Sequence, residues 1–130
     1  FGRGGISDLP LNGDRTTPRG EFRVIRINEA SRFHLFIGID YPTMSHIDKA
    51  RRRGLMGEHE YRQSLDHGLR YGHFPQDGVL GGYIGFHGIG EGDPEIHERF
   101  HWTQGCIALT NEQIEQLHAH IEIGTRVLIE

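Results

Sequence analysis

The chain has 130 residues, enough for one domain that buries a hydrophobic core without a metal ion or a disulfide. It carries 14 lysine and arginine residues against 18 aspartate and glutamate residues, and the formal charge of −4 argues against a nucleic-acid-binding surface. No apolar run approaches the roughly 18 residues of a membrane span, and a single cysteine excludes an intrachain disulfide. No export signal is visible. Because the sequence begins at Phe1 rather than methionine, we expect a processed or trimmed chain with one domain over residues 1–130.

The first third of the sequence predicts a β-hairpin. After a glycine-rich arm at residues 1–15, a Thr-Pro-Arg-Gly turn leads into a β-rich run at residues 21–27. Residues 33–39 alternate large apolar side chains with other residues, which is typical of a half-buried strand. The two runs are expected to pair through a loop at residues 28–32, and Pro42 ends the second strand because proline cannot donate to a ladder.

Residues 43–72 change character and predict two short helices packed over the sheet, as an insertion in a β core. The first helix is expected to stop at Gly54, and the second to be interrupted near Gly68. The basic cluster at residues 49–53 is expected to be a solvated helix face. The loop at residues 71–82 ends in two glycines before the next strand, and such loops often serve as lids.

The last part of the sequence predicts a strand, a turn, a helix and a final strand. Residues 83–87 alternate as a strand does, with His87 at its end. Thr110 and Gln113 form a capping box that starts a helix, and Gly124 is expected to end it before a strand at residues 125–129. This helix follows the only cysteine and is expected to support the cysteine loop.

Cys106 and His87 are the candidate reacting pair. A cysteine attacks carbonyl groups as its thiolate, so it needs a nearby base to take its proton. Glycine in the turn Thr103-Gln104-Gly105-Cys106 permits positive φ and lets successive backbone N–H groups converge on one point. We therefore predict Cys106 as the nucleophile, His87 as the base, and the amides of Gln104, Gly105 and Cys106 as an oxyanion hole. The alternative is an inert, buried thiol.

These segments together resemble the L,D-transpeptidase catalytic domain family, also called the YkuD type. The resemblance rests on His87-Gly88, on the Thr-Gln-Gly-Cys turn and on the upstream run at residues 16–22, which occur in the family's order. It covers about residues 13–39 and 83–129. It implies a mainly β fold with helices: a YkuD-like β-sandwich or mixed sheet with a helical insertion at about 43–72 and a C-terminal helix and strand. It also implies that the Gly88 carbonyl orients His87.

The resemblance further implies a bacterial enzyme of the periplasm or cell envelope that acts, without a cofactor and as a monomer, on peptidoglycan stem peptides in cell-wall biogenesis and cell shape. An amine acceptor gives a cross-link or attaches a wall protein, whereas water gives hydrolysis. Many transpeptidases carry arginine or asparagine two residues after the cysteine, where this chain has Ala108. Alanine there, together with Thr103, looks more like the branch that includes hydrolases that detach proteins from the wall. Both acceptors stay open.

Five further residues are predicted to contact substrate: Tyr41, Tyr83, His101, Trp102 and Thr103. Two alternatives come from other classes. One is a zinc site that uses His97 and His101 at i, i+4 spacing with His87 and Cys106, although no His-Glu-x-x-His motif is present. The other is a non-catalytic wall-binding module in which Cys106 is inert.

Overall fold

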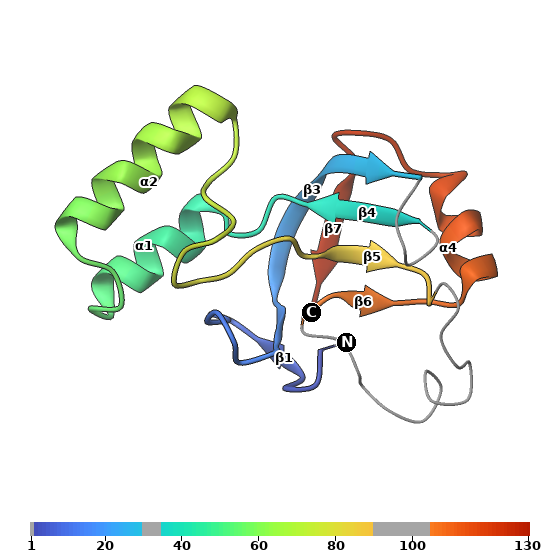
Figure 1. Cartoon of the computed structure of the whole chain (residues 1–130), viewed down its shortest axis with the longest axis horizontal. Coiled ribbons are helices and arrows are strands. Elements are labelled where there is room, and N and C mark those ends of the chain that lie inside the picture. Colours follow the sequence, from blue (N-terminus) through green and yellow to red (C-terminus); the bar gives the residue numbers. More distant parts are fainter. Residues whose placement is uncertain (1, 30–34, 90–104) are drawn as a thin grey trace.

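A mixed sheet forms the centre of the computed structural model, which describes residues 2–29, 35–89 and 105–130. The described residues form a five-stranded sheet of order β6-β5-β4-β3-β7, a separate parallel pair β1-β2, and three helices. Figure 1 shows α1 and α2 together on one side of the sheet and α4 at the other. The elements are β1 (Ile6–Ser7), β2 (Thr17–Pro18), β3 (Gly20–Asn28), β4 (Phe36–Ile39), α1 (Met44–Arg52), α2 (Glu58–Tyr71), β5 (Gly85–His87), β6 (Ile107–Ala108), α4 (Asn111–His118) and β7 (Arg126–Ile129).

The predicted hairpin is present as the antiparallel pair β3 and β4, with Val24 opposite Ile39 and Asn28 opposite Phe36. The inward positions of these strands are buried, and the Ile37 side chain is fully covered. Two apolar clusters result. One joins the sheet to the α1 and α2 pair, and the other joins it to Ile114 of α4. The helical insertion and the C-terminal helix and strand therefore both occur as predicted.

The predicted break in the second helix is wrong, because α2 runs without interruption from Glu58 to Tyr71. Gly68 is required there by packing: a Cβ at this position would lie 2.8 Å from the ring of Phe74. The helix ends instead at Gly72, which has a left-handed backbone with φ of 78°. The two glycines therefore serve different purposes: Gly68 allows close packing against Phe74, and Gly72 lets the chain reverse direction.

The C-terminal helix begins as predicted but ends earlier. The Thr110 hydroxyl accepts from the Gln113 N–H at 3.1 Å, and the Gln113 side chain accepts from the Thr110 N–H at 2.9 Å. The helix stops at His118, so the prediction that Gly124 ends it is wrong. The Gly124 N–H instead donates to the Val24 carbonyl at 2.8 Å, which ties the turn before β7 to β3. No helix among the described residues is long and apolar enough to span a membrane.

His46 of α1 is a buried titratable group beside the core. Its ring stacks on Phe22 and meets Tyr41 edge-on, with centroids 5.6 Å and 4.8 Å away. Nδ1 accepts from the Thr43 N–H at 3.3 Å, and Nε2 lies 3.3 Å from the Arg19 carbonyl. Burial lowers the pKa of His46, and the contact with the Arg19 carbonyl opposes this shift. The folded chain therefore resists protonation of this ring.

We predict that His46 makes the fold sensitive to acid. Because the unfolded chain protonates this ring more readily, the free energy of unfolding should fall as the pH drops below about 6.5. His46→Gln should reduce that loss, as measured by urea denaturation at about pH 7 and about pH 5. The exposed His59→Gln is the matched control and should keep the wild-type pH dependence. Equal pH dependence in wild type and His46→Gln would contradict this prediction.

Candidate active site

The predicted reacting residues lie on two adjacent segments, strand β5 and the residue that leads into β6. Strands β5 and β6 are parallel, with Phe86 opposite Ile107 and His87 opposite Ala108. Cys106 directly precedes β6, and extending the register by one residue places it beside Gly85. Side chains alternate along a strand, so the register assigns Cys106 and His87 to the same face of neighbouring chain segments, offset by two residues. Figure 1 shows β5 and β6 side by side.

The His87 ring is held by the residue that follows it. Its Nδ1 lies 2.6 Å from the Gly88 carbonyl oxygen, and the side chain is buried. Because a carbonyl oxygen only accepts, the neutral ring carries its proton on Nδ1 and a lone pair on Nε2. The His87 carbonyl accepts from the Leu109 N–H at 2.9 Å, and the Gly88 N–H donates to the Leu35 carbonyl at 3.3 Å. The main chain around this imidazole is therefore fixed by both neighbouring strands.

The Cys106 thiol is half-buried and lies within hydrogen-bonding distance of a backbone carbonyl. Sγ donates to the Tyr83 carbonyl at 3.4 Å. Burial raises the pKa of the Cys106 thiol, while a hydrogen bond from the Gly85 backbone lowers it, and burial has the larger effect. Loss of the proton therefore needs a base, since the surroundings of the sulfur do not favour the thiolate by themselves.

Tyr83 lies at the entrance to β5 with an unusual backbone. Its φ is 54°, a left-handed value that is uncommon for a residue other than glycine. The Tyr83 N–H donates to the Gln76 side chain at 2.9 Å, and the Tyr83 carbonyl accepts a hydrogen bond from the Cys106 thiol. The ring is 60% exposed, and the Arg26 guanidinium lies 5.6 Å from its centroid. Tyr83 therefore contacts the cysteine through its carbonyl and is itself exposed at the surface.

Gly105 occupies a position that only glycine fits. Its φ is 133°, and a Cβ there would lie 2.8 Å from the Thr16 carbonyl oxygen and 2.9 Å from Ile84. The Thr17 hydroxyl donates to the Gly105 carbonyl at 2.7 Å and accepts from the Gly2 N–H at 2.7 Å. Thr17 is fully buried. The upstream threonine and the residue before the cysteine are therefore bonded directly to each other.

Comparison with known proteins places the chain in a family. The family model for YkuD, the L,D-transpeptidase catalytic domain, matches residues 2–129. The chain belongs to the YkuD family. Proteins of this family are generally cysteine L,D-transpeptidases that act on peptidoglycan stem peptides.

A solved structure gives an independent view of this YkuD fold. The structure of Bdellovibrio bacteriovorus Bd1075 is similar to it with a TM-score of 0.56 and 18% sequence identity, over 94% of this chain. The chain corresponds to 36% of the Bd1075 chain, and at this identity the likeness concerns the fold. A search of curated proteins found no match.

The remaining residues predicted to form the site in this YkuD domain fall into two groups. Tyr41 is 1% exposed, and its hydroxyl donates to the carbonyls of Pro10 and Leu80, each at 2.8 Å. The structure thus places Tyr41 in the core, where it packs instead of facing a cleft. The other predicted residues lie outside the described residues, as does His97 of the zinc alternative: His101, Trp102, Thr103 and Gln104. Within the described ranges, no group of three or more potential metal ligands occurs.

Two contacts near the predicted catalytic residues were not assigned from the sequence. Thr17 was recognised only as part of a family motif, and its bond to Gly105 joins segments far apart in the chain. Asn111 is the first residue of α4, and its side-chain oxygen accepts from the Ile89 N–H at 3.0 Å. That bond anchors α4 to the segment after His87. Neither contact has a local sequence signal besides the motif itself.

We predict that Gly105→Ala is more destabilising than an ordinary substitution at positive φ. Gly54 has φ of 73° with open space around it, so Gly54→Ala measures backbone strain alone, about 1–2 kcal/mol. Gly105→Ala adds a collision with main chain and should cost about 1–3 kcal/mol more. Chemical denaturation of both variants gives the difference. Equal losses would show that the turn before Cys106 has room for a side chain.

Proposed function

We propose that this chain catalyses cysteine-dependent acyl transfer on peptidoglycan stem peptides. The observation that carries the proposal is the contact between His87 Nδ1 and the Gly88 carbonyl, which assigns the ring proton to Nδ1 and makes Nε2 the basic nitrogen, on the strand beside Cys106. Membership of the YkuD family supports the substrate class. A base of defined tautomer next to a lone thiol is what nucleophilic catalysis by cysteine requires.

The reaction proceeds in two steps. His87 Nε2 takes the proton of Cys106 as Sγ attacks the carbonyl carbon, and the imidazolium then gives that proton to the leaving amine. A thioester to Cys106 remains, and an acceptor amine, which loses its proton to His87, attacks it and releases the thiol. Because burial raises the pKa of Cys106, a base is needed to take this proton, and His87 is proposed for that role.

Backbone amides near the sulfur are proposed to hold the oxyanion, with Gln104, Gly105 and Cys106 as the donors. A trans peptide unit is planar, and its carbonyl and N–H point in opposite directions. Because Thr17 holds the Gly105 carbonyl, the N–H of Cys106 points away from Thr17. Thr17 is therefore a positioning residue for this amide. Removing an oxyanion donor typically lowers turnover by about 10²–10³-fold.

Hydrolysis is the second candidate, and the position of Ala108 favours it. Ala108 lies directly opposite His87 on the neighbouring parallel strand. A methyl group there leaves space beside the imidazole that an arginine or asparagine side chain would take. Water in that space would be activated by His87 in the second step and would release the acyl group as an acid. An L,D-specific carboxypeptidase, amidase or endopeptidase would result.

Further expectations belong to the same proposal. Tyr83, His101, Trp102 and Thr103 would line the substrate cleft, with the exposed ring of Tyr83 at its mouth. Residues 1–130 would act as one catalytic domain and as a monomer, without a cofactor, in the periplasm or cell envelope of a bacterium. A wall-attached protein would be a second partner if the acceptor amine belongs to one.

We predict that purified stem peptides are converted by the wild-type chain through a thioester on Cys106. Mass spectrometry of the products should show dimers if the acceptor is an amine, and shortened stems if it is water. Cys106→Ser should abolish conversion, and His87→Gln should lower it by about 10²–10⁴-fold because general-base catalysis is lost.

His73→Gln is the matched control, since the His73 ring also contacts a main-chain carbonyl, that of Phe74 at 3.2 Å. This variant should keep wild-type turnover. A chelator should have no effect; metal-dependent turnover without an adduct on Cys106 would favour the zinc alternative. Binding to cell wall without any adduct or turnover would favour the non-catalytic module.

We also predict that Thr17→Val slows acylation of Cys106 by up to about 10²-fold, because the Gly105–Cys106 peptide loses its anchor. Thr17→Ser keeps the hydroxyl and should restore most of the rate. Single-turnover acylation with a carbapenem, read by mass, separates this effect from binding. Equal acylation rates in Thr17→Val and wild type would show that Thr17 does not position the Cys106 amide.

A further inference from the structure

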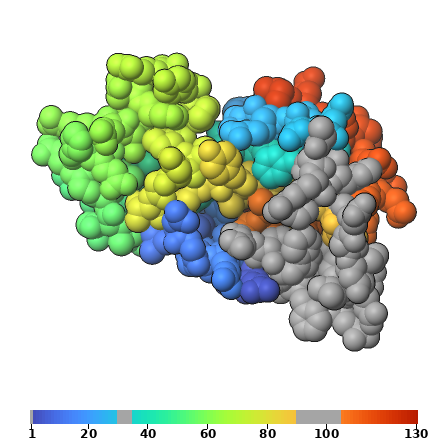
Figure 2. All heavy atoms as spheres, viewed as in Figure 1, coloured from blue at the N-terminus to red at the C-terminus, as the bar shows by residue number. Residues whose placement is uncertain are grey.

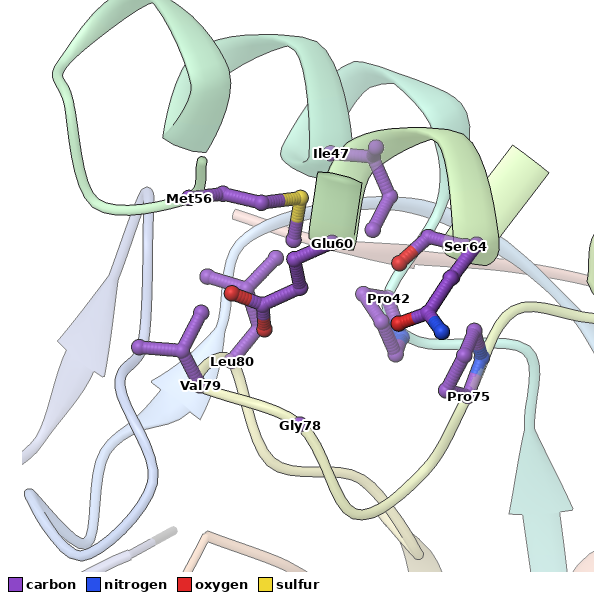
Figure 3. Close-up of a pocket in the computed structure, with 10 residues that line it drawn as sticks. Pro42, Ile47, Met56, Glu60, Ser64, Pro75, Gly78, Val79 and Leu80 are labelled. Carbon is purple, nitrogen blue, oxygen red and sulfur yellow. The ribbon is translucent and has the colours of Figure 1, made fainter. Parts of the chain in front are cut away.

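A pocket separate from the candidate active site lies in the helical part of the molecule, between α2 and the segment that follows it. Its volume is about 150 Å³, and none of its lining residues belongs to the active site (Figure 3). Figure 2 shows this segment, in yellow, on the surface between the helical pair and the sheet. A cavity of this size holds one molecule of about six heavy atoms. Most of its walls are apolar: Pro42, Ile47, Met56, Pro75, Val79 and Leu80.

Three polar side chains of α2 line the pocket, Glu60, Gln63 and Ser64, and of these only Glu60 carries a charge. Glu60 and Ser64 are four residues apart on the helix, so they lie on the same face. Figure 3 shows both on the pocket side of α2. Ser64 is only 5% exposed, and its hydroxyl has no hydrogen-bond partner in the part of the chain that the structure describes. A buried hydroxyl without a partner is unfavourable, so this group is better satisfied by a ligand.

The Glu60 carboxylate lies in the first turn of α2, where the helix dipole favours a negative charge, but it has no hydrogen-bonding partner among the described residues. An acidic residue at this position commonly bonds back to the N-cap N–H, but Glu60 makes no hydrogen bond or ion pair with any described residue. Glu58, by contrast, pairs with Arg62 at 2.9 Å. Glu60 Oε1 lies 3.8 Å from the position that a Cβ of Gly78 would take, so the loop passes close over the carboxylate.

We propose that this pocket binds a primary ammonium group carried on a short aliphatic chain. The carboxylate of Glu60 and the hydroxyl of Ser64 would accept the ammonium N–H groups, and the apolar walls would cover the chain. The lining contains neither lysine nor arginine, so an anion has no counter-charge there. It also contains no aromatic ring, and such rings are the usual partners of a quaternary ammonium ion.

Butylammonium is the probe that tests this site, titrated into the whole chain while the Met56 methyl resonance is followed by NMR. The shift should saturate, and butanol, a neutral molecule of the same size, should bind at least about tenfold more weakly. Glu60→Gln should weaken binding by about 10–100-fold, as expected for loss of a charged acceptor. Glu58→Gln is the matched control on the same helix turn and should bind as wild type does.

Ser64→Ala is the second variant and should weaken binding by about 2–10-fold. A lysine residue blocked at both backbone ends tests the source of the group: its binding assigns a side chain of a peptide, and binding of butylammonium alone assigns a free amine. A Met56 shift that does not saturate, equal binding of butanol, or full affinity in Glu60→Gln would overturn the proposal. Cys106→Ser protein should bind normally, so this outcome is independent of the proposed acyl transfer.

Discussion

The hydroxyl of Thr17 is the contact on which the geometry of the cysteine turn depends. It is buried, it donates to the Gly105 carbonyl, and it accepts from the Gly2 N–H. Both bonding directions are used, so removing the hydroxyl would leave a carbonyl and an N–H without partners in the interior. The residue before Cys106 therefore takes its position from the beginning of the chain. The Thr-Pro-Arg-Gly run is therefore tied to the cysteine turn by a direct hydrogen bond.

Elements with a strong periodic or capping pattern were predictable from the sequence, and elements fixed by distant contacts were not. The alternation in β4 and the reciprocal bonds of Thr110 and Gln113 are local, and both occur as predicted. Gly68 has the propensity of a helix breaker, yet the ring of Phe74 selects glycine there within an intact helix. The two-residue strand β6 has no period to detect, because its place is set by pairing with β5.

The candidate site also contains both features that local sequence predicts and features that only the fold determines. The residue types and order of His87, Gly88, Gly105 and Cys106 pointed to the pair, because nucleophile and base chemistry restricts which residues serve. The contact between Nδ1 and the Gly88 carbonyl followed from the family resemblance and is present at 2.6 Å. Tyr41 has an aromatic side chain suited to a cleft, but its hydroxyl bonds two carbonyls inside the core. The sequence shows that Tyr41 has an aromatic ring and a hydroxyl, but only the fold shows that this side chain lies in the core.

Burial disfavours a charged pair at Cys106 and His87. His87 is covered and Cys106 is half-covered, and separating charge between them would require desolvating both an imidazolium and a thiolate. A neutral thiol that donates to the Tyr83 carbonyl and a neutral ring that donates to the Gly88 carbonyl satisfy both protons without that penalty. A substrate carbonyl that approaches Sγ would compete with Tyr83 for this region. In the proposed acyl transfer, proton loss to Nε2 would therefore accompany the attack of Sγ on the substrate carbonyl.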